Sequence, residues 1–512
     1  MKKLISILLV LALALSLAAC GLSLGGKGGS PAAKTKVQKP SVIHGMMQED
    51  GTAYVPKDDG SVIKINDDVD TAVLSPDRKT LVVLLTDGTL YYTDAEQSEK
   101  HEVADKIDWL SVVRNEGAFY IDEEDDVFCV IFESGETVKL GHDIDGIVAP
   151  DSLDSIIYDD DGGIYLYKTG EGSPEKVGRL DGDVAPLCIN NDGSLACWYV
   201  SDEGKTTLYS YENDERTTIA SLDDDYDSFR AVASEDQALF VLCDVDADQL
   251  FLKKPGEEAV KVRLGNELAS TGIYCQKGLL TETEAAEVSC LYVLVEADKG
   301  NSLYFIDLEG ERERMITGID SMAISDGYIV YRNDEDTLYF AQLDGAELKE
   351  ESRIASDVEL FRVQGDYVYY FRNCEDNSGT LYCRKLSEAD GEAVKIASDV
   401  GCYIGTWSKN DYLCVNESGD TVFYFRNLEE IKNSYMDMGT LYRWSWGDEE
   451  PTKIASDVVQ GTVTSYLLSG VVVPDRMGFM RYDSTNDDRD VVGDLYFYDG
   501  SDTSKIASEV IY

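Results

Sequence analysis

The pentapeptide Ile354-Ala355-Ser356-Asp357-Val358 recurs three times further along the chain. Its copies span 396–400, 454–458 and 506–510, and the last of them has Glu509 in place of the aspartate. A Leu-Tyr pair stands shortly before each copy, and similar apolar–aromatic pairs continue upstream. The ten pairs begin at Leu90, Val127, Ile164, Leu208, Leu250, Leu303, Leu338, Leu381, Leu441 and Leu495, which gives a repeat of about 45 residues.

Each repeat consists of short alternating or aromatic runs, such as 367–371, separated by clusters of Asp, Asn and Gly. Such runs are typical of β-strands, and the clusters between them are typical of tight turns. A period of about 45 residues is the size of one four-stranded blade of a β-propeller. One such sheet cannot bury both of its faces alone, so neighbouring sheets must stack. The sequence therefore predicts an all-β protein, a β-propeller built from about ten four-stranded repeat units.

Ten units exceed the four to eight blades that are usual in one ring. We therefore favour two tandem propellers, an N-terminal one over 43–270 and a C-terminal one over 271–512. The step from Leu250 to Leu303 is longer than its neighbours and contains a run of Thr, Glu and Ala at 281–287, which places the boundary in this region. One oversized ring is the competing arrangement.

The N-terminus has the pattern of an export signal. Lys2 and Lys3 precede an apolar run over 4–17 that is too short for a comfortable transmembrane helix. The run ends in Leu17-Ala18-Ala19-Cys20-Gly21, which resembles the lipobox of bacterial lipoproteins. The resemblance implies removal of a signal peptide over 1–19 and acylation of Cys20; an ordinary signal peptide without lipid is the alternative. Residues 20–42, rich in Gly, Ser, Pro and Lys, then form a flexible basic stalk.

Two stretches resemble known propeller repeats. The run Leu-Ser-Pro-Asp-Arg-Lys-Thr-Leu at 74–81, followed by Asp-Gly-Thr-Leu-Tyr at 87–91, resembles the repeat of propellers related to the periplasmic protein TolB. The region 315–512 resembles the repeats of clostridial surface lipoproteins, which are similar to the low-density-lipoprotein-receptor type of propeller. Such repeats indicate a fold far better than they indicate a function.

The charge of the chain restricts its partners. Lys and Arg number 45 against 98 Asp and Glu, and the formal net charge is −53. Such a surface repels nucleic acid, so we expect no nucleic-acid partner. Hydrophobic residues make up 43% of the chain and Tyr alone contributes 31 residues. The acidity therefore belongs to a folded protein with a large core, not to a disordered tail.

The cysteines after Cys20 show no Cys-x-x-Cys spacing of the kind found in zinc or redox sites. Cys188 and Cys197 are symmetric about Asp192-Gly193, and Cys374 and Cys383 are symmetric about Ser378-Gly379. If each hairpin closes with a two-residue loop, both pairs face each other across neighbouring strands. The two pairs are candidate disulfides in an exported protein. The alternative is that each cysteine is a small buried hydrophobe.

The sequence offers little catalytic or metal-binding chemistry. Its three histidines lie in no metal-binding motif, and it has neither a Gly-x-Ser-x-Gly elbow nor a Gly-x-Gly-x-x-Gly loop. Asp244, Asp246 and Asp248 have the opening spacing of a calcium loop, but Gln249 stands where such a loop needs Gly. We predict no cofactor, with these three aspartates as weak candidates for structural calcium; a solvated turn is the alternative.

These observations favour a lipid-anchored, extracytoplasmic binding or scaffold protein, with no enzymatic activity. We expect it on the outer face of the bacterial cytoplasmic membrane, held by the lipid on Cys20, with a propeller face that binds a protein or an envelope or extracellular glycan. The alternative is an envelope hydrolase or polysaccharide-processing enzyme on the same scaffold, with a site assembled from loops of distant blades.

Overall fold

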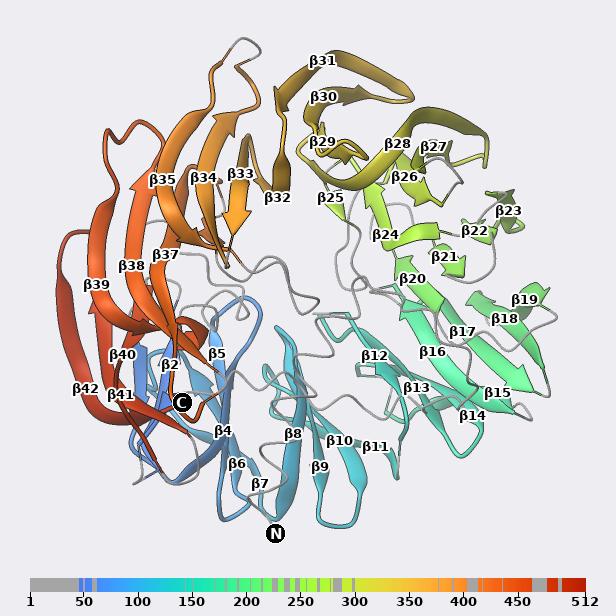
Figure 1. The fold of residues 1–512 in the computed structure, drawn as a ribbon. Helices are drawn as coiled ribbons and strands as arrows, with labels where there is room; N and C mark the ends of the chain where they lie inside the picture. The colour runs from blue at the N-terminus through green and yellow to red at the C-terminus, as the bar shows by residue number, and fades with distance from the viewer. Residues whose placement is uncertain are drawn as a thin grey trace.

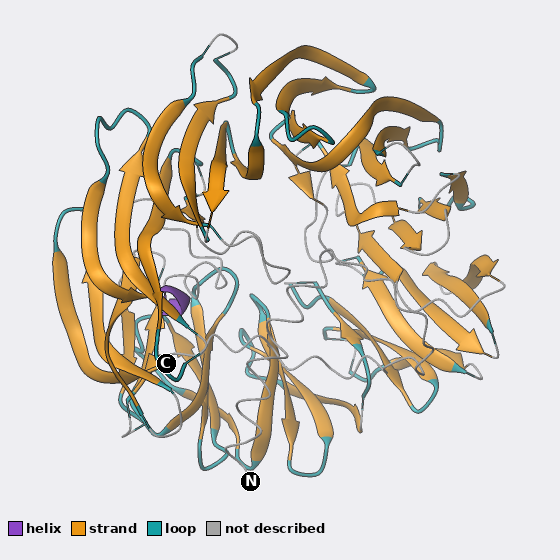
Figure 2. Ribbon diagram, in the orientation of Figure 1, coloured by secondary structure: helices purple, strands orange, loops and turns teal. Residues whose placement is uncertain are grey.

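A computed structural model gives the fold of the chain (Figure 1). It describes residues 46–512 except for 49–50, 58–61, 143, 151, 171, 180–181, 191–192, 203, 213–214, 223–228, 234–239, 245–248, 255, 265–267, 277, 280–287, 297–299, 376, 389–390, 403–412, 417, 435, 463–476 and 487–489. The described residues are almost entirely strands and turns, apart from one helical turn at 460–462 (Figure 2). The all-β prediction is confirmed. No described helix has the length and apolar character needed to cross a membrane.

The first five blades are antiparallel four-stranded sheets whose strands pair in sequence order. Blade 1 contains β4 (Val69–Leu74), β5 (Thr80–Leu85), β6 (Leu90–Asp94) and β7 (His101–Ala104). Blade 2 contains β8 (Ile107–Val113), β9 (Gly117–Asp122), β10 (Asp126–Ile131) and β11 (Thr137–His142). Blade 3 contains β12 (Ile147–Val148), β13 (Ser155–Asp160), β14 (Gly163–Lys168) and β15 (Glu175–Arg179). Blade 4 contains β16 (Asp183–Ile189), β17 (Leu195–Asp202), β18 (Lys205–Glu212) and β19 (Glu215–Leu222). Blade 5 contains β20 (Phe229–Ala233), β21 (Phe240–Asp244), β22 (Gln249–Lys253) and β23 (Val260–Arg263).

The next five blades are less separate. Blades 6 and 7 share one strand, and blades 8, 9 and 10 belong to one continuous sheet. Blade 6 contains β24 (Leu268–Cys275), β25 (Gly278–Leu279), β26 (Cys290–Val295), β27 (Asn301–Asp307) and the first part of β28 (Arg312–Ser325). Blade 7 contains the rest of β28, β29 (Tyr328–Asn333), β30 (Leu338–Asp344) and β31 (Glu347–Ala355). Blade 8 contains β32 (Val358–Gln364), β33 (Tyr367–Glu375), β34 (Ser378–Lys385) and β35 (Val394–Gly401). Blade 9 contains β36 (Leu413–Val415), β37 (Thr421–Glu430), β38 (Asp437–Ser445) and β39 (Thr452–Val459), and blade 10 contains β40 (Met477–Thr485), β41 (Val491–Tyr498) and β42 (Thr503–Ile511).

A small three-stranded unit lies between blade 10 and blade 1. This closing unit contains β1 (Met46–Met47), β2 (Ala53–Pro56) and β3 (Val62–Ile65). Met47 pairs with Ile511 at the end of β42, and the side-chain amide of Gln48 donates a hydrogen bond to the carbonyl oxygen of Ser508 at 2.6 Å. The N-terminal and C-terminal strands of the described chain therefore lie side by side (Figure 1).

The Leu-Tyr pairs and their equivalents lie in corresponding strands, one in each blade, and explain the sequence repeat: β6, β10, β14, β18, β22, β27, β30, β34, β38 and β41. The apolar residue that begins each pair is at most 1% exposed. The aromatic residue after it commonly stacks on the aromatic residue directly opposite on the preceding strand. Tyr370 stacks on Tyr382 and Tyr424 on Tyr442, with ring centroids 5.3 and 5.7 Å apart. Aromatic pairs of this kind contribute about 0.5–1.5 kcal/mol beyond the burial of their area. The repeated pair therefore stabilises the core.

The pentapeptide carries the chain from the last strand of one blade towards the next blade. Its fourth residue adopts a left-handed conformation in all four copies, with φ of 55° at Asp357, 57° at Asp399, 59° at Asp457 and 57° at Glu509. Aspartate adopts this conformation more readily than most residues other than glycine. The valine that follows is fully buried in each copy. The motif therefore combines a left-handed turn residue with a buried valine. It recurs because each of these four connections needs both.

The core lies between the blades. Because side chains alternate across a strand, Ile156 and Tyr158 of β13 face blade 2, whereas Ile157 between them faces blade 4. In the described part of the chain, eleven buried apolar clusters follow one another in this way, and each joins two successive units of the ring. Every blade therefore has two apolar faces, and each is covered by a neighbour.

The blades are arranged as a single ring (Figure 1), the competing arrangement in the sequence analysis. The boundary that we favoured at 270/271 falls inside β24. One apolar cluster joins Leu250 and Leu252 of blade 5 to Leu291 and Val293 of blade 6 across this point. A division into 43–270 and 271–512 would expose the cluster to water, which is the physical reason for a continuous ring.

We therefore expect residues 43–270 and 271–512, produced as separate chains, to fail to fold independently. Each half would lose the cluster that joins blades 5 and 6 and the pairing of β1 with β42. Circular dichroism and limited proteolysis of the two halves, compared with the whole chain, provide the measurement. Two protease-resistant, cooperatively melting halves would support the tandem-propeller interpretation instead.

Candidate functional site

Several of the residues predicted to be functional lie outside the described part of the chain. These are the signal peptide over 1–19, Cys20 with the stalk over 20–42, and the calcium candidates Asp246 and Asp248. Asp244 is the last residue of β21. Within the described residues, no group of three or more His, Cys, Asp or Glu side chains is arranged to hold a metal ion. Lipidation of Cys20 and weak calcium binding remain predictions.

Cys188 and Cys197 lie where the sequence placed them. The two residues are directly opposite each other on β16 and β17. Both are almost fully buried, at 2% and 0% exposure, and belong to the apolar cluster between blades 4 and 5. The structure has no disulfide between them. The predicted register is confirmed here, and a disulfide between these cysteines remains a prediction.

Cys374 and Cys383 are not opposite each other, so this part of the prediction was wrong. Cys383 pairs with Tyr369, and the hairpin turns between Glu375 and Ser378 instead of at Ser378-Gly379. The main cause is the position of this turn, which lies two residues earlier than assumed. An irregularity between Arg372 and Glu375, where Asn373 takes a left-handed φ of 54°, shifts the register by one further residue. Extra residues in one strand shift every pair beyond them, so counting outward from an assumed turn fails.

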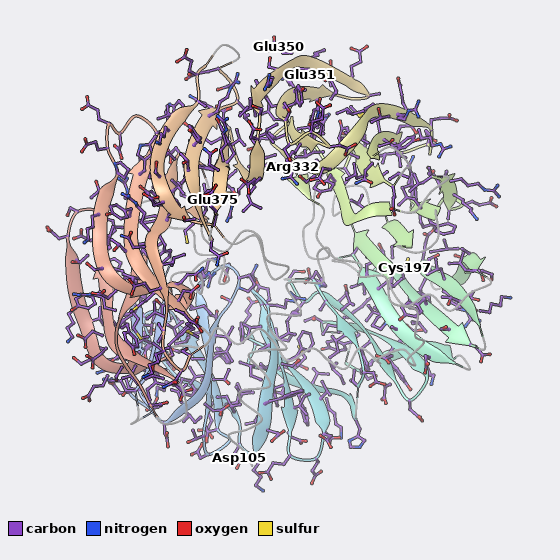
Figure 3. All side chains as sticks on the ribbon, in the orientation of Figure 1. Asp105, Cys197, Arg332, Glu350, Glu351 and Glu375 are labelled. Atoms are coloured by element: carbon purple, nitrogen blue, oxygen red, sulfur yellow. The ribbon has the colours of Figure 1, made fainter. Side chains whose placement is uncertain are left out.

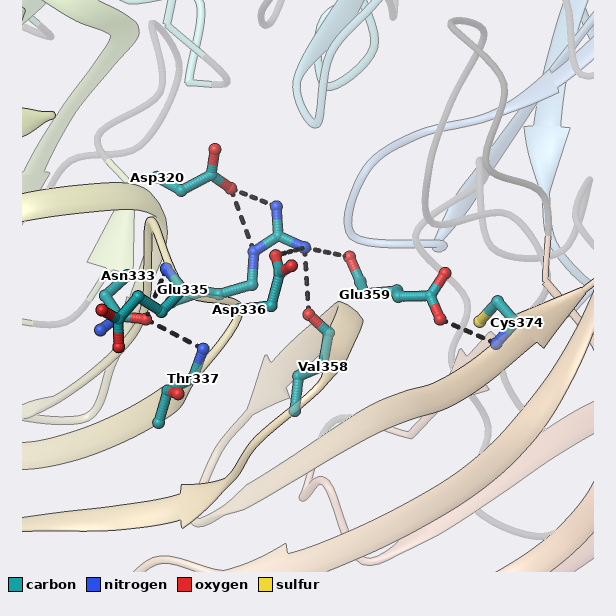
Figure 4. A network of polar contacts seen from close by, with 9 residues as sticks. Asp320, Asn333, Glu335, Asp336, Thr337, Val358, Glu359 and Cys374 are labelled. Carbon is teal, nitrogen blue, oxygen red and sulfur yellow. Dashed lines mark hydrogen bonds and ion pairs between the residues drawn. The ribbon is translucent and has the colours of Figure 1, made fainter.

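A polar network joins blades 7 and 8 through Arg332 on β29 (Figure 4). Its guanidinium group donates to the carboxylate of Asp320 on β28, at 3.0 Å from Nε, and to the carbonyl oxygens of Val358 and Glu359 on β32. The carboxylate of Glu359 accepts a hydrogen bond from the backbone N–H of Cys374 at 2.8 Å. Arg332 lies towards the centre of the ring, whereas Glu350 and Glu351 lie on its outer rim (Figure 3). The network therefore ties neighbouring blades together near the centre.

The same kind of contact recurs in the following blades, and we call its members the clasp arginines: Arg332, Arg372, Arg426 and Arg481. Each of the last three lies 3.5–3.6 Å from the acidic residue of the pentapeptide that ends the preceding blade, namely Asp357, Asp399 and Asp457. Each also covers the tyrosine ring of the Leu-Tyr pair in its own blade, 5.5–5.9 Å from the centroid. Sequence reasoning missed them, although arginine recurs just after the apolar or aromatic run in each of these four repeats. These ion pairs and ring contacts all lie within the fold, so we assign the clasp arginines a structural role.

The described histidines and the most strongly perturbed aspartate also have local structural partners. The ring of His101 stacks on Tyr92 at 5.0 Å, and Nδ1 of His142 lies 3.1 Å from a carboxylate oxygen of Asp126. Burial raises the pKa of Asp159 to about 7, although the hydrogen bond from the backbone N–H of Gly146, at 2.6 Å, opposes this rise. Asp159 thus fixes the turn before β12, and its partner is a backbone group.

A groove lies where β23 of blade 5 meets the start of β28 in blade 6. It has a volume of about 520 Å³ and is lined by Lys261, Val262, Arg263, Gly310, Glu311 and Arg312. The turn on the blade 6 side is held by Asp307, whose carboxylate accepts hydrogen bonds from the backbone N–H groups of Glu309 and Glu311, both at 2.9 Å. Gly310 has a φ of 84°, and a Cβ there would lie 2.5 Å from the side chain of Val260. Only glycine therefore lets the two blades approach this closely.

The groove is basic in a strongly acidic chain. Three cationic side chains, Lys261, Arg263 and Arg312, line it beside one carboxylate, that of Glu311, while the whole chain carries −53. Arg312 is held in place, because its Nη1 donates to the carbonyl oxygen of Leu264 at 2.6 Å and its guanidinium lies 5.6 Å from the Tyr304 ring centroid. Screening in physiological salt acts over about 8 Å, so the local cations dominate the field inside the groove.

Comparison with known proteins gives only distant similarity. No family model and no curated protein matches the chain. Among solved structures, the chain is similar to the tricorn protease at 10% identity and a TM-score of 0.30, over 88% of this chain and 55% of the protease. It is similar to dipeptidyl peptidase 4 of Porphyromonas gingivalis at 9% identity and a TM-score of 0.36, over 71% of this chain and 65% of the peptidase. The chain thus spans only part of the length of these proteins, and the fold assignment rests on its own sheets.

The clasp arginines lead to a prediction about stability. Replacing Arg426 by Met keeps an apolar stem but removes the charge near Asp399 and above Tyr442. We expect a loss of about 1 kcal/mol in the free energy of unfolding, because a partly exposed ion pair and a cation–π contact are each worth less than that. The measurement is denaturant unfolding. The control is Lys349→Met, which breaks the exposed ion pair with Asp344 and should lower the free energy of unfolding much less. Equal losses in the two variants would contradict the role of the clasp.

Proposed function

We propose that the chain is a lipid-anchored, extracytoplasmic binding scaffold, and that it takes an anionic envelope polymer in the groove between blades 5 and 6. The observation that carries the proposal is the charge of this groove. Lys261, Arg263 and Arg312 all line this groove, together with the buried residue Val262. Guanidinium groups match the geometry of carboxylates and phosphates, and a lysine adds a point charge.

The construction of the groove supports a binding role. Lys261 and Arg263 project from the same side of β23, because residues two apart in a strand share a face. Arg312 enters from the neighbouring blade, and its contacts with Leu264 and Tyr304 fix its position before a ligand arrives. A site held in its binding geometry loses less entropy on association. The groove is open to solvent, so a segment of a polymer can reach it.

The proposed location rests on the N-terminal sequence. A charged start, an apolar run and Cys20 occur together in the order of a lipoprotein signal. The basic stalk over 20–42 can lie near anionic headgroups while the acidic ring is repelled from them. The groove would then face the envelope, where anionic polymers are found.

Charge reversal in the groove tests the binding proposal. Polyglycerol phosphate and polyglutamate, with neutral dextran as the reference polymer, serve as probes in a sedimentation or surface-binding assay. We expect the wild-type chain to bind an anionic probe, and the double variant Lys261→Glu with Arg263→Glu to bind it about tenfold more weakly, a difference of about 1.4 kcal/mol. Added salt should weaken the wild-type interaction as well.

The matched control is Lys505→Glu, which reverses an exposed lysine on β42 in blade 10. It changes the net charge in the same direction without touching the groove, so binding should be nearly unchanged. Equal affinity of the groove double variant and the wild type would refute the site, and binding of neutral dextran alone would refute the charge argument. Circular dichroism shows whether each variant remains folded.

Replacement of Cys20 by Ser tests the anchor. Without the thiol no acyl chain can be attached, so we expect the chain to be released from the membrane fraction or to keep its leader. In cells, membrane fractionation measures retention of the chain, and the mass of the N-terminal peptide shows whether the leader was removed. The control is Cys129→Ser, at a buried position in the blade 2–3 cluster, which should leave fractionation unchanged. Normal processing and normal membrane retention of the Cys20 variant would contradict the proposal.

A further inference from the structure

Cys374 and Cys402 lie side by side in blade 8. Cys374 is near the end of β33, and Cys402 directly follows β35, where its backbone N–H donates to the carbonyl oxygen of Asn377 at 2.9 Å. Gly379 on β34 makes room for both sulfurs. A Cβ added to this glycine would lie 2.8 Å from Sγ of Cys374 and 3.1 Å from Sγ of Cys402. The two thiols are close enough to share a hydrogen bond.

From this geometry we propose that Cys374 and Cys402 are a redox-active thiol pair that closes to a disulfide when the chain meets an oxidant. The bond would connect the turn between β33 and β34 to the end of β35, where the described part of blade 8 ends. It would join β33 to the end of β35, and β34 already pairs with both of these strands. This pair differs from both pairs that the sequence suggested.

The surroundings of the two sulfurs suit such a reaction. Cys374 is half-buried, so an oxidant can reach it, whereas Cys402 is only 1% exposed and lies behind it. The hydrogen bond from the Cys374 thiol lowers the pKa of Cys402, against the opposing effects of burial and of the Glu359 carboxylate. A thiol elsewhere behaves differently: burial alone raises the pKa of Cys129 to about 12. The thiolate is the reactive form, so Cys402 is the better internal nucleophile.

The chemistry balances with a disulfide as the oxidant, either a small molecule or an oxidoreductase. The Cys374 thiol first loses its proton, which is harder than usual because its hydrogen bond to Cys402 and burial raise its pKa. The Cys374 thiolate attacks the oxidant disulfide, forms a mixed disulfide and releases one thiol. The Cys402 thiolate then attacks the Cys374 sulfur, and the second thiol leaves. The two cysteines lose two electrons and two protons in total, and the oxidant becomes two thiols. A reducing dithiol reverses both steps.

Differential alkylation of the full chain tests the proposal. The purified protein is incubated with oxidised or with reduced glutathione, alkylated, digested and analysed by mass spectrometry. After oxidation we expect a linked peptide pair that contains Cys374 and Cys402, and a fall of about tenfold in the alkylation of Cys374. After treatment with dithiothreitol both residues should be alkylated again.

Two variants separate this reaction from general oxidation. Cys402→Ser should abolish the linked peptides and leave Cys374 open to alkylation or to a mixed disulfide with glutathione. Cys414→Ser removes another buried thiol, in the blade 9–10 cluster, and should leave the link unchanged. The wild-type measurement stands even if a variant fails to fold. Full alkylation of Cys374 in oxidised, natively folded wild type, or a link from Cys374 to another cysteine, would overturn the proposal.

Discussion

Burial of both faces of every blade is the constraint on which the ring depends. In β5 of blade 1, Val82 and Leu84 face blade 2, while Leu81 and Val83 face the closing unit. A blade at the end of an open stack would leave one such face in water, at a cost of about 25 cal/mol per Å² of apolar surface. The closing unit removes both ends at once: Tyr54 packs towards blade 10, and Val55 beside it packs towards blade 1. Closure therefore follows from the same alternation that builds each blade.

The repeat in the sequence predicted this fold because each of its recurring positions has the same structural role in successive blades. The leucine of each Leu-Tyr pair fills the core, its tyrosine stacks across the sheet, and the pentapeptide turns the chain towards the next blade. The number of rings could not be predicted in the same way. A repeat specifies contacts between neighbours, whereas closure depends on a contact between the two ends, here Met47 with Ile511. Because one propeller ring usually has four to eight blades, the ten repeats favoured two rings over one.

Prediction of the sites succeeded only where the chain is regular. Cys188 and Cys197 are opposed as counted, but the turn between β33 and β34 lies two residues earlier than assumed, and the irregularity beside Asn373 adds a shift of one residue, so Cys374 is not opposite Cys383. The true neighbour, Cys402, is in another strand, and no local count could find it. The clasp arginines were visible as a recurring residue after an apolar or aromatic run, but their acidic partners belong to the preceding blade. The groove draws its cations from two blades, and only the fold brings these together.

The closing unit also decides how the ring would respond to mechanical force. It begins directly after the stalk, so a pull on a membrane-anchored N-terminus acts first on β1. This strand has two residues and meets the last strand of the ring at Met47 and Ile511. The joint between blades 6 and 7 is different, since β28 runs without a break through both blades over 14 residues. Tension would therefore open the ring at one defined seam and leave the ten blades as a curved stack with the blade 10 face uncovered.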